Sequence, residues 1–312
     1  MSWIGRLAPS PTGVLHLGNA RSFLLAWLDA RQAHGKLLLR IEDLDGPRNK
    51  PGAVEATLED LQWLGLDWDG PVNLQSERHA RHQEVLLQLL AQGDVYPCIC
   101  TRKDVEQAAS APHAGEEGPV YPGTCRERFA PGVAGLGEAE AEGGRKPFLR
   151  FRVRPGVVQV QDSFCGPHNF DVFQSLGDFP IWRREEEAAY HLAVVVDDHD
   201  QGVNRVVRGD DLLSSAARQI QLHQALGWEL PTYAHVPLVL GDDGKRLAKR
   251  HGDTSLREFR RQGVSAEQIL AWLGQSCGLP VAEHQGDLRK LLKLWAWERL
   301  PSAPVFWRDR LD

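Results

Sequence analysis

The chain has 312 residues, of which 42% are hydrophobic and 25% are charged, and this composition excludes a disordered or fibrous protein. At about 150 residues per domain, the length predicts roughly two domains. The formal net charge of −6 excludes a protein that coats nucleic acid by its overall charge, so an RNA partner requires a local basic patch. The five cysteines are too few for a disulfide scaffold and indicate a reducing compartment.

The sequence shows no pattern of a membrane span or an export signal. No apolar run approaches the ~18 residues of a membrane helix. The N-terminus reaches Pro9 without the lysine-led apolar stretch of a signal peptide. We therefore expect a cytoplasmic protein with no membrane partner, and we expect a monomer.

The N-terminal part of the chain has the pattern of a strand, a helix and a second strand. Residues 3–8 are expected to form a buried strand that ends at the turn Pro9–Gly13. A helix is predicted over residues 18–34, where apolar residues have helical spacing and Gly35 stands at the C-cap position. The apolar run Leu37–Ile41 is typical of a parallel strand covered on both faces. Such a unit is expected to be right-handed.

A second unit of this kind is predicted further along the chain. We expect strands over residues 191–196 and 205–208, a helix over residues 211–226 and a strand over residues 236–240. This arrangement predicts an α/β domain that is split into two halves.

The segments between and after these halves differ in character. Residues 130–146 are rich in glycine, alanine and glutamate and are expected to form a mobile surface loop, followed by a β-rich run over residues 148–161. After about residue 252 the pattern is helical, with helices predicted over residues 255–262, 265–274 and 287–300. We therefore expect an inserted subdomain and a small C-terminal helical domain.

A glycine-containing turn leads from the first predicted strand to His16 at the start of the first predicted helix. Residues 9–19 are Pro-Ser-Pro-Thr-Gly-Val-Leu-His-Leu-Gly-Asn. A helix N-terminus favours bound phosphate because its backbone N–H groups point outward, and an imidazole can donate to the same phosphate. Taken alone, the pattern is more typical of a histidine that only caps a helix.

A second segment concentrates positive charge. Residues 245–250 are Lys-Arg-Leu-Ala-Lys-Arg and follow an Asp-Asp-Gly turn. Such a loop can neutralise charge that develops during phosphoryl or adenylyl transfer. A solvated basic loop is the alternative for a charge run of this kind.

These two segments resemble the HIGH and KMSKS signatures of class I aminoacyl-tRNA synthetases. Five ordered blocks are also similar to glutamyl-tRNA synthetases, namely Arg6-Leu-Ala-Pro-Ser-Pro-Thr-Gly, Leu39-Arg-Ile-Glu-Asp-Leu-Asp, Gly65-Leu-Asp-Trp-Asp-Gly, Tyr190-His-Leu-Ala-Val-Val-Val-Asp-Asp and Val207-Arg-Gly-Asp-Asp-Leu. The resemblance extends from Arg6 to about Ser255. In the signature loop, Arg246 and Ala248 replace lysine and serine, so we expect weaker hydrogen bonding there but not a loss of activity.

Full glutamyl-tRNA synthetases continue into a helical anticodon-binding domain, whereas this chain stops at Asp312. In this respect it resembles the glutamyl-queuosine tRNA(Asp) synthetases, which are stand-alone paralogues of the catalytic region. The resemblance implies a class I synthetase fold with a Rossmann-like parallel sheet. It divides the chain into a first catalytic half (1–95), an inserted zinc-binding subdomain (96–185), a second catalytic half (186–240) and the signature loop with a helical domain (241–312).

The resemblance also assigns a site. L-glutamate is expected to be bound by Arg6, Leu7, Ala8, Pro9, Ser10, Glu42, Tyr190 and Arg208. Arg208 is the expected partner of a substrate carboxylate, with Arg6 assisting, and Glu42 is expected to accept from the α-ammonium group. The expected catalytic residues are His16 and Lys249, and ATP, accompanied by Mg²⁺, is expected at His16, Gly18, Asn19 and Lys249.

Three cysteines lie close in sequence, Cys98, Cys100 and Cys125. Zinc prefers four ligands in a tetrahedron, so three thiolates leave one position to fill. By resemblance to the glutamyl-queuosine enzymes, Tyr121 is the fourth ligand of one structural zinc ion. Water, Glu127 and His113 remain alternative fourth ligands, and three thiols without a metal remain an alternative to zinc.

Other residues that invite a functional interpretation have a structural explanation. Asp197 and Asp198 are expected to hold a strand-end turn and to pair with neighbouring arginines. Cys165, Cys277 and the tryptophans are expected to pack; the tryptophans in question are Trp27, Trp63, Trp68 and Trp182.

The function that the resemblance implies has two steps. L-glutamate is activated by ATP without tRNA, and is then transferred to the cyclopentenediol of queuosine at the wobble position of tRNA(Asp). The anticodon stem-loop is expected to bind a groove lined by Arg205, Arg208, Arg246 and Arg250. Two alternatives are a truncated glutamyl-tRNA synthetase that charges a tRNA 3′ end, and an inactive paralogue that serves as an RNA-binding module.

Overall fold

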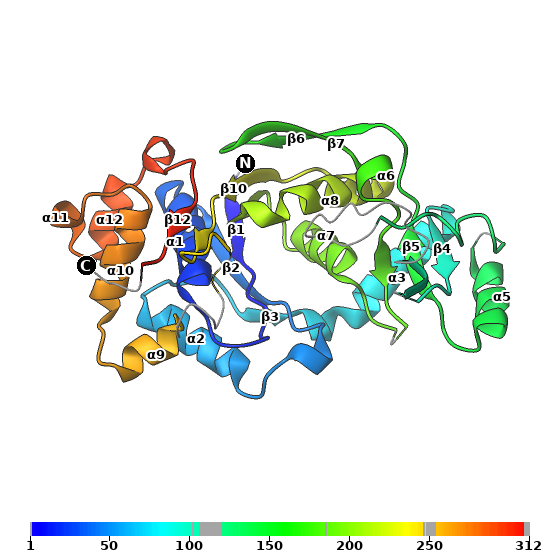
Figure 1. Cartoon of the computed structure of the whole chain (residues 1–312), viewed down its shortest axis with the longest axis horizontal. Helices are drawn as coiled ribbons and strands as arrows, with labels where there is room; N and C mark the ends of the chain where they lie inside the picture. Colours follow the sequence, from blue (N-terminus) through cyan, green and yellow to red (C-terminus); the bar gives the residue numbers. More distant parts are fainter. Residues whose placement is uncertain are drawn as a thin grey trace.

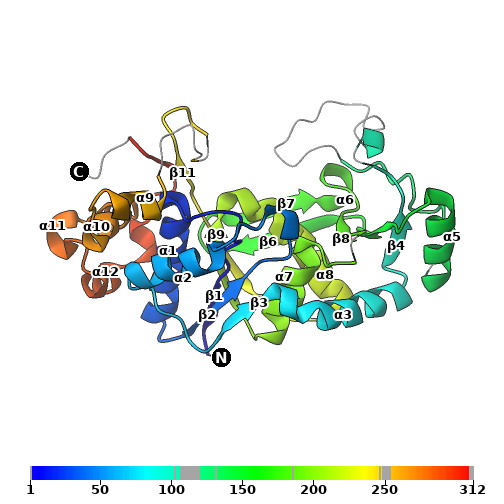
Figure 2. The ribbon, with the colours of Figure 1, turned by 90° about the horizontal axis from the view of Figure 1, so that it is seen from below.

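Two halves of the chain build the parallel sheets at the middle of an elongated molecule (Figure 1). The computed structural model describes residues 2–101, 103–105, 120–130, 132–184, 186–245, 247 and 254–308. The C-terminal helices lie at one end and an antiparallel subdomain at the other (Figure 2).

The first half forms one parallel sheet. Strand β1 (Ile4–Leu7) pairs with β2 (Lys36–Ile41), which pairs with β3 (Val72–Leu74). Helix α1 (Leu17–Gln32) connects β1 to β2, so the predicted strand–helix–strand pattern is confirmed. The remaining elements of this half are η1 (Gly46–Arg48), α2 (Ala53–Trp63), η2 (Gln75–Arg78) and α3 (His79–Ala91).

The second half adds a parallel pair. Strand β9 (Arg205–Gly209) pairs with β10 (Thr232–Val236), and η3 (Asp210–Leu212) and α8 (Leu213–Leu226) connect them. The Asn204 N–H donates to the carbonyl of Ile4 (3.1 Å), so β9 starts beside β1. The predicted strand over residues 236–240 is divided between β10 and β11 (Val239–Leu240), which pairs with β12 (Val305–Phe306).

The strand predicted over residues 191–196 is wrong, because these residues form the middle of helix α7 (Tyr190–Asp200). Every residue from Leu192 to Asp198 is buried. A helix that is buried all round shows no polar face from which its period could be recognised, so a short apolar run of this kind is ambiguous.

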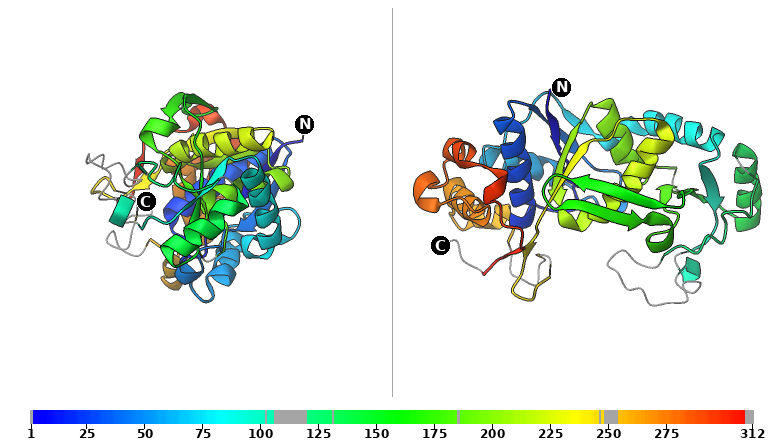
Figure 3. Two further views of the ribbon diagram at one scale, coloured as in Figure 1. Left: turned by 90° about the vertical axis from the view of Figure 1, so that its right-hand side faces the viewer. Right: turned by 90° about the horizontal axis from the view of Figure 1, so that it is seen from above.

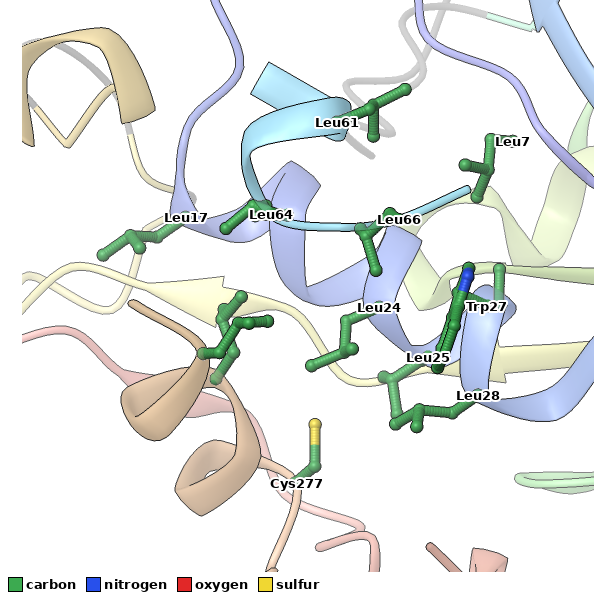
Figure 4. Packing of buried hydrophobic residues seen from close by; sticks show 14 of the residues in the cluster. Leu7, Leu17, Leu24, Leu25, Trp27, Leu28, Leu61, Leu64, Leu66 and Cys277 are labelled. Atoms are coloured by element: carbon green, nitrogen blue, oxygen red, sulfur yellow. The ribbon is translucent and has the colours of Figure 1, made fainter. Parts of the chain in front are cut away.

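Helix α1 lies in the largest hydrophobic core. Leu24, Leu25 and Leu28 are fully buried among apolar side chains of the sheet and of the C-terminal helices (Figure 4). Cys277 packs in the same core, as predicted. Cys165 is exposed in the turn after β6, so the prediction that Cys165 packs in the interior is wrong. The four tryptophans pack as predicted: Trp27 and Trp182 are buried, and Trp63 and Trp68 are partly buried against this core.

The segment between the two halves carries an antiparallel sheet. Strand β4 (Val95–Cys98) pairs with β5 (Phe148–Phe151), which pairs with β8 (Pro180–Trp182). Strands β6 (Val157–Asp162) and β7 (Gly166–Asp171) form a hairpin that runs along the molecule, and α6 (Val172–Ser175) follows it (Figure 3). Because β6 pairs with β10, this hairpin belongs to the sheet of the second half. The boundaries at residues 96 and 185 stay a prediction.

Residues 130–146 do not match the predicted mobile loop. Within them lies helix α5 (Val133–Gly143), whose Ala139 is buried against a cluster that includes Tyr96 and Phe129. The helix-forming alanines, leucine and glutamates outweigh the glycines, and Gly144, with φ of 63°, ends the helix as a left-handed C-cap.

The C-terminal part is helical, as predicted. Its elements are α9 (Leu256–Arg261), α10 (Ala266–Ser276), α11 (Val281–His284), α12 (Leu288–Leu294) and η5 (Trp297–Arg299). The third predicted helix, over residues 287–300, ends earlier than expected, at Leu294. Within the described part of the chain, no helix combines the length and the apolar character that crossing a bilayer requires.

Asp29 of α1 joins the C-terminal part to the start of the sheet. Its carboxylate accepts hydrogen bonds from the indoles of Trp3 (3.2 Å) and Trp297 (2.8 Å) and from Arg205 Nε (3.0 Å). Arg205 lies against both indole rings and is 4% exposed. The prediction that Arg205 lines an RNA-binding groove is therefore wrong, because its guanidinium is a buried structural group at the start of β9.

Candidate active site and cysteine cluster

A cavity of about 500 Å³ lies where β1, β2, β9 and β10 end. Ligands bind α/β sheets at such carboxyl-terminal strand ends. Among its lining residues are most of those predicted from the sequence, namely Arg6, Ala8, Pro9, Ser10, His16, Gly18, Asn19, Glu42, Tyr190 and Arg208. Leu7 belongs to the same segment, but its side chain is fully buried in the core. Lys249 lies outside the described residues.

The cavity also has lining residues to which the sequence assigned no individual role. They come from the turn before α1, from α1 itself and from the segments after β9 and β10, and they include Thr12, Ser22, Phe23, Asp211, Leu212, Leu238, Val239 and Leu247. Thr12, Asp211, Leu212 and Leu247 lie within the recognisable blocks and the signature loop, and the others lie near such segments in sequence, so position in or near a motif is the signal that could have found them.

Arg40 holds a buried charge network beneath the cavity. Its Nη1 donates to Asp198 Oδ1 (2.7 Å) and its Nη2 donates to Glu42 Oε1 (3.3 Å). Asp198 Oδ1 also lies 3.5 Å from Arg6 Nε, so one carboxylate serves two guanidinium groups. Burial raises the pKa of Glu42, and the charges of Arg40 and Arg6 oppose this rise.

Asp197 and Asp198 pair with arginines, as predicted, but from helix α7 and not from a strand-end turn. Asp197 accepts from Arg78 Nε (2.7 Å) and from Gln75 Nε2 (2.9 Å), and it lies 2.9 Å from His82 Nε2. These contacts join α7 to η2 and α3. Burial alone would raise the pKa of Asp197, but its hydrogen bond with His82 and the charge of Arg40 outweigh burial and lower it.

Arg208 is 6% exposed and lies at the end of β9. Its Nε donates to His235 Nε2 (3.0 Å), its Nη2 donates to the carbonyl of Leu212 (3.3 Å), and its guanidinium lies over the ring of Tyr233. Its third nitrogen, Nη1, is buried and has no hydrogen-bond partner among the described residues. A buried donor without an acceptor is costly, so Arg208 is suited to bind an anion that enters the cavity.

His16 is the N-cap of α1, so the structural interpretation of this histidine holds. Its Nδ1 accepts the N–H of Gly18 (3.1 Å), while the Asn19 side chain accepts the N–H of His16 (3.2 Å). Because Nδ1 is an acceptor, the proton of the neutral ring is on Nε2, which can donate. A Cβ at Gly18 would lie 3.0 Å from the His16 ring, so glycine permits this close approach.

Leu247 within the basic loop and the described residues after the loop adjoin the start of α1. Leu247 lines the cavity, and Ser255 forms a β-bridge with His16. The Leu17 N–H donates to the carbonyl of Thr254 (3.1 Å). Arg246 and residues 248–253, which include Lys249 and Arg250, lie outside the described residues.

Cys98, Cys100 and Cys125 meet at the end of β4, with their sulfur atoms within 4.8 Å of one another. Cys100 Sγ lies 3.5 Å from Cys125 Sγ. Tyr121 Oη lies 3.4 Å from Cys98 Sγ and 3.9 Å from Cys100 Sγ, and it accepts the backbone N–H of Cys125 (2.8 Å). The four predicted zinc ligands therefore lie together.

The spacing of these atoms fits a tetrahedral zinc site. Zinc–sulfur bonds of about 2.3 Å separate two sulfur ligands by about 3.8 Å, and a zinc–oxygen bond of about 2.1 Å gives an oxygen–sulfur separation of about 3.6 Å. Glu127 is directed elsewhere, since it accepts from Arg152 Nη1 (2.6 Å) and its side chain is 80% exposed. His113 lies outside the described residues.

The cluster also favours a thiolate. A hydrogen bond with Cys125 and the nearby charge of Arg150 lower the pKa of Cys98 to about 4, against the effect of burial. The guanidinium of Arg150 lies over the ring of Tyr121, 3.8 Å from its centroid. A thiolate is the form that binds a metal.

Comparisons with known proteins give a consistent result. Residues 4–288 match the family model "tRNA synthetases class I (E and Q), catalytic domain". The Glutamyl-Q tRNA(Asp) synthetase of Rhodopirellula baltica is 50% identical, over 97% of this chain and 96% of that protein. Glutamate–tRNA ligase 1 of Methylorubrum extorquens is 43% identical, over 88% of this chain and 57% of that protein.

A solved structure confirms the predicted fold. The crystal structure of a glutamate tRNA ligase from Elizabethkingia meningosepticum in complex with its amino acid superposes with a TM-score of 0.83. The two chains are 26% identical, and the match covers 98% of this chain and 67% of the other. Given the fold, the cavity at the strand ends and the family match over residues 4–288, the chain belongs to the class I tRNA synthetases of the E and Q group.

Proposed function

We propose that this protein activates L-glutamate with ATP and transfers it to queuosine in tRNA(Asp). The observation that carries the proposal is the 50% identity to a Glutamyl-Q tRNA(Asp) synthetase, together with mutual coverage of 97% and 96%. Three further relatives with the same name are 44–47% identical. The charge arrangement of the cavity supports a zwitterionic substrate with an extra carboxylate.

In the proposed amino-acid site, the cavity supplies both signs of charge. Arg208 binds a substrate carboxylate through its unpaired Nη1, and Arg6 assists. Glu42 accepts from the α-ammonium group, and the charges of Arg40 and Arg6 favour its carboxylate form against the effect of burial. Tyr190 contributes its hydroxyl, whose pKa burial raises, so it remains a donor. Ala8, Pro9 and Ser10 form the adjoining wall, and Leu7 anchors this segment in the core.

In the proposed first step, the glutamate α-carboxylate attacks the α-phosphorus of ATP, and the bond to pyrophosphate breaks. His16 donates from Nε2 to the phosphate at the N-terminus of α1, where Gly18 and Asn19 complete the site. Lys249 neutralises charge on the leaving pyrophosphate. When bound together with ATP, Mg²⁺ would supply further positive charge beside the phosphates. Holding the two reactants in line supplies much of the acceleration, because the carboxylate is already a nucleophile.

In the proposed second step, a hydroxyl of the queuosine cyclopentenediol takes the glutamyl group from the adenylate and AMP leaves. The base lies at the wobble position of the tRNA(Asp) anticodon, and single-stranded RNA loops of this kind are read with their bases splayed out. Support for this acceptor comes from the similarity to the Glutamyl-Q tRNA(Asp) synthetases.

A structural zinc ion at Cys98, Cys100, Cys125 and Tyr121 is part of the proposal. The close approach of the four ligand atoms and the lowered pKa of Cys98 support it. When bound, zinc would cross-link the end of β4 to the segment around residues 121–125.

The test is to map the glutamate in the product. tRNA(Asp) with and without queuosine is incubated with labelled glutamate and ATP, and the product is cut into anticodon and acceptor fragments. We expect label on the anticodon fragment of queuosine-containing tRNA alone. Label on the 3′-terminal adenosine would overturn the proposal in favour of a truncated glutamyl-tRNA synthetase. No label anywhere would favour an inactive RNA-binding paralogue.

A further inference from the structure

Two buried residues behind the cavity, Asp162 and His235, form a hydrogen-bonded chain that ends on Arg208. Asp162 Oδ2 lies 2.6 Å from His235 Nδ1, and Arg208 Nε lies 3.0 Å from His235 Nε2. Asp162 is 7% exposed, His235 is 0% exposed and Arg208 is 6% exposed. The chain links β6, β10 and β9, which are neighbours in one sheet.

The direction of each hydrogen bond follows from what the groups can do. Arginine has no acceptor, so His235 Nε2 must present its lone pair to Arg208. The proton of a neutral His235 is then on Nδ1, where it is donated to Asp162. The opposite tautomer would place two N–H groups against each other at Arg208 and a lone pair against the carboxylate. Burial also lowers the pKa of His235, which agrees with a neutral ring.

Asp162 holds this tautomer because both of its oxygens accept. Oδ1 accepts the N–H groups of Phe164 and Cys165 (both 2.9 Å), and Oδ2 accepts the N–H of His235 (3.0 Å) in addition to its ring. Every hydrogen-bonding position of the carboxylate therefore faces a donor. A group that can only accept keeps the proton of the neutral imidazole on Nδ1, which leaves the lone pair of Nε2 for Arg208.

We propose that Asp162 and His235 are positioning residues for glutamate recognition, and that they orient the Arg208 guanidinium so that Nη1 faces a substrate carboxylate. This inference rests on the proposed function. Without the bond to His235, Arg208 keeps the carbonyl of Leu212 and the ring of Tyr233 as partners, and these leave rotation of the guanidinium less restricted. The expected consequence is weaker binding of glutamate with ATP binding unchanged.

Two substitutions at His235 separate this role from a structural one. Asparagine reproduces the position of Nδ1 and can keep the contact with Asp162, whereas glutamine reproduces the position of Nε2 and can accept from Arg208. In ATP–pyrophosphate exchange, we expect His235→Asn to raise the KM for glutamate about tenfold, with the KM for ATP and kcat unchanged. We expect His235→Gln to stay within about twofold of the parent. The buried His223 of α8 gives a matched control, since His223→Gln should leave the glutamate KM unchanged.

Equal effects of the two His235 variants, the reverse order, or a fall in kcat in place of a rise in KM would overturn the proposal. A second measurement uses the parent protein, so it does not depend on whether a variant folds, and it requires no substrate. Nitrogen NMR of histidine-labelled parent protein should show His235 with a protonated Nδ1 and a bare Nε2. The opposite tautomer or an imidazolium ion at neutral pH would also overturn it. If the parent protein shows no exchange with glutamate while NMR shows the expected tautomer, the proposed function is wrong. The hydrogen-bond geometry from Asp162 through His235 to Arg208 is then still confirmed.

Discussion

The cavity and the cysteine cluster both bury ionisable groups, but they balance charge in different ways. In the cavity, Asp198 and Glu42 face Arg40, and Asp198 also faces Arg6. At the cluster, three thiols lie within 4.8 Å of one another, and Arg150 is the cation that lowers the pKa of Cys98. Opposite charges from distant parts of the chain therefore stabilise the cavity, whereas one guanidinium cannot balance more than one thiolate.

This difference in charge balance indicates which of the two sites depends on an added ion. Unpaired buried charges are costly, so the cluster gains most from a divalent cation that holds several thiolates together. The cavity is assembled by β1, β2, α7 and β9, and a substrate carboxylate could satisfy the buried Nη1 of Arg208. The two sites should consequently respond to different perturbations.

The largest expected effect is at the cluster. We expect about one zinc per chain in the purified protein and little or none in Cys100→Ser, because structural zinc contributes about 10–16 kcal/mol to small zinc modules. Elemental analysis by mass spectrometry measures this, with the exposed Cys165→Ser as the control. Tyr121→Phe should weaken zinc retention more mildly. Stoichiometric zinc in Cys100→Ser would contradict the ligand assignment.

The next effect is at the charge network. Arg40→Met leaves Asp198 and Glu42 buried beside each other without their shared partner, so we expect a loss of about 3–5 kcal/mol in the free energy of unfolding. Arg81→Met removes a more exposed arginine that pairs with Asp200, and here we expect a loss of less than about 1 kcal/mol. Urea denaturation of the parent and of both variants measures these losses in the free energy of unfolding. Equal losses would show that the network is not the balanced unit described here.

A smaller effect is expected on substrate binding. Arg208→Ala removes the proposed carboxylate partner and should raise the KM for glutamate by roughly ten- to a hundredfold, which corresponds to about 1.5–3 kcal/mol. The KM for ATP should change little, and zinc content should not change. A parallel rise of both constants would mean that Arg208 supports the fold of the cavity and does not bind the substrate.

The smallest effect concerns pH. Burial alone would raise the pKa of Asp162, but hydrogen bonds from His235, Cys165 and Phe164 outweigh burial and lower it from the ordinary 3.8 to about 2. A folded-state pKa below the unfolded value means that the carboxylate stabilises the fold above about pH 4 and loses this contribution as the pH falls through about 2. We expect the stability difference between the parent and Asp162→Asn to shrink by about 1–2 kcal/mol across this range. The free energies of unfolding of the parent and Asp162→Asn are measured by urea titration at each pH. If their difference does not change with pH, this role for the ionised carboxylate is excluded.

The residues of the cavity could be predicted from the sequence more completely than the secondary structure could. Arg6, Glu42 and Arg208 stand at strand ends within recognisable blocks, and the structure brings them to one cavity. Arg40 and Asp198 are 158 positions apart, so their pairing has no local pattern that could predict it. The same holds for Asp162 and His235, which are 73 positions apart and meet because β6 pairs with β10.

The errors in the sequence interpretation have physical causes as well. Residues 192–198 of helix α7 are all buried, so this stretch lacks the polar face whose periodicity distinguishes a helix from a strand. Helix α5 contains several glycines, and its packing against the cluster around Tyr96 compensates for their low helix propensity. Arg205 was grouped with the groove-lining arginines although it begins the strand predicted over residues 205–208, whereas ligands bind at the carboxyl-terminal ends of such strands. Its pairing with Asp29 places it at the opposite end.

The proposal that this protein activates L-glutamate with ATP is tested most directly by ATP–pyrophosphate exchange with glutamate in the absence of tRNA. Label passes from pyrophosphate into ATP only if glutamyl-adenylate forms reversibly, so the assay reports the first step alone. We predict glutamate-dependent exchange by the parent protein without tRNA, and its retention in Cys165→Ser. Exchange that appears only after tRNA is added, or no exchange with glutamate under any condition, would contradict the account.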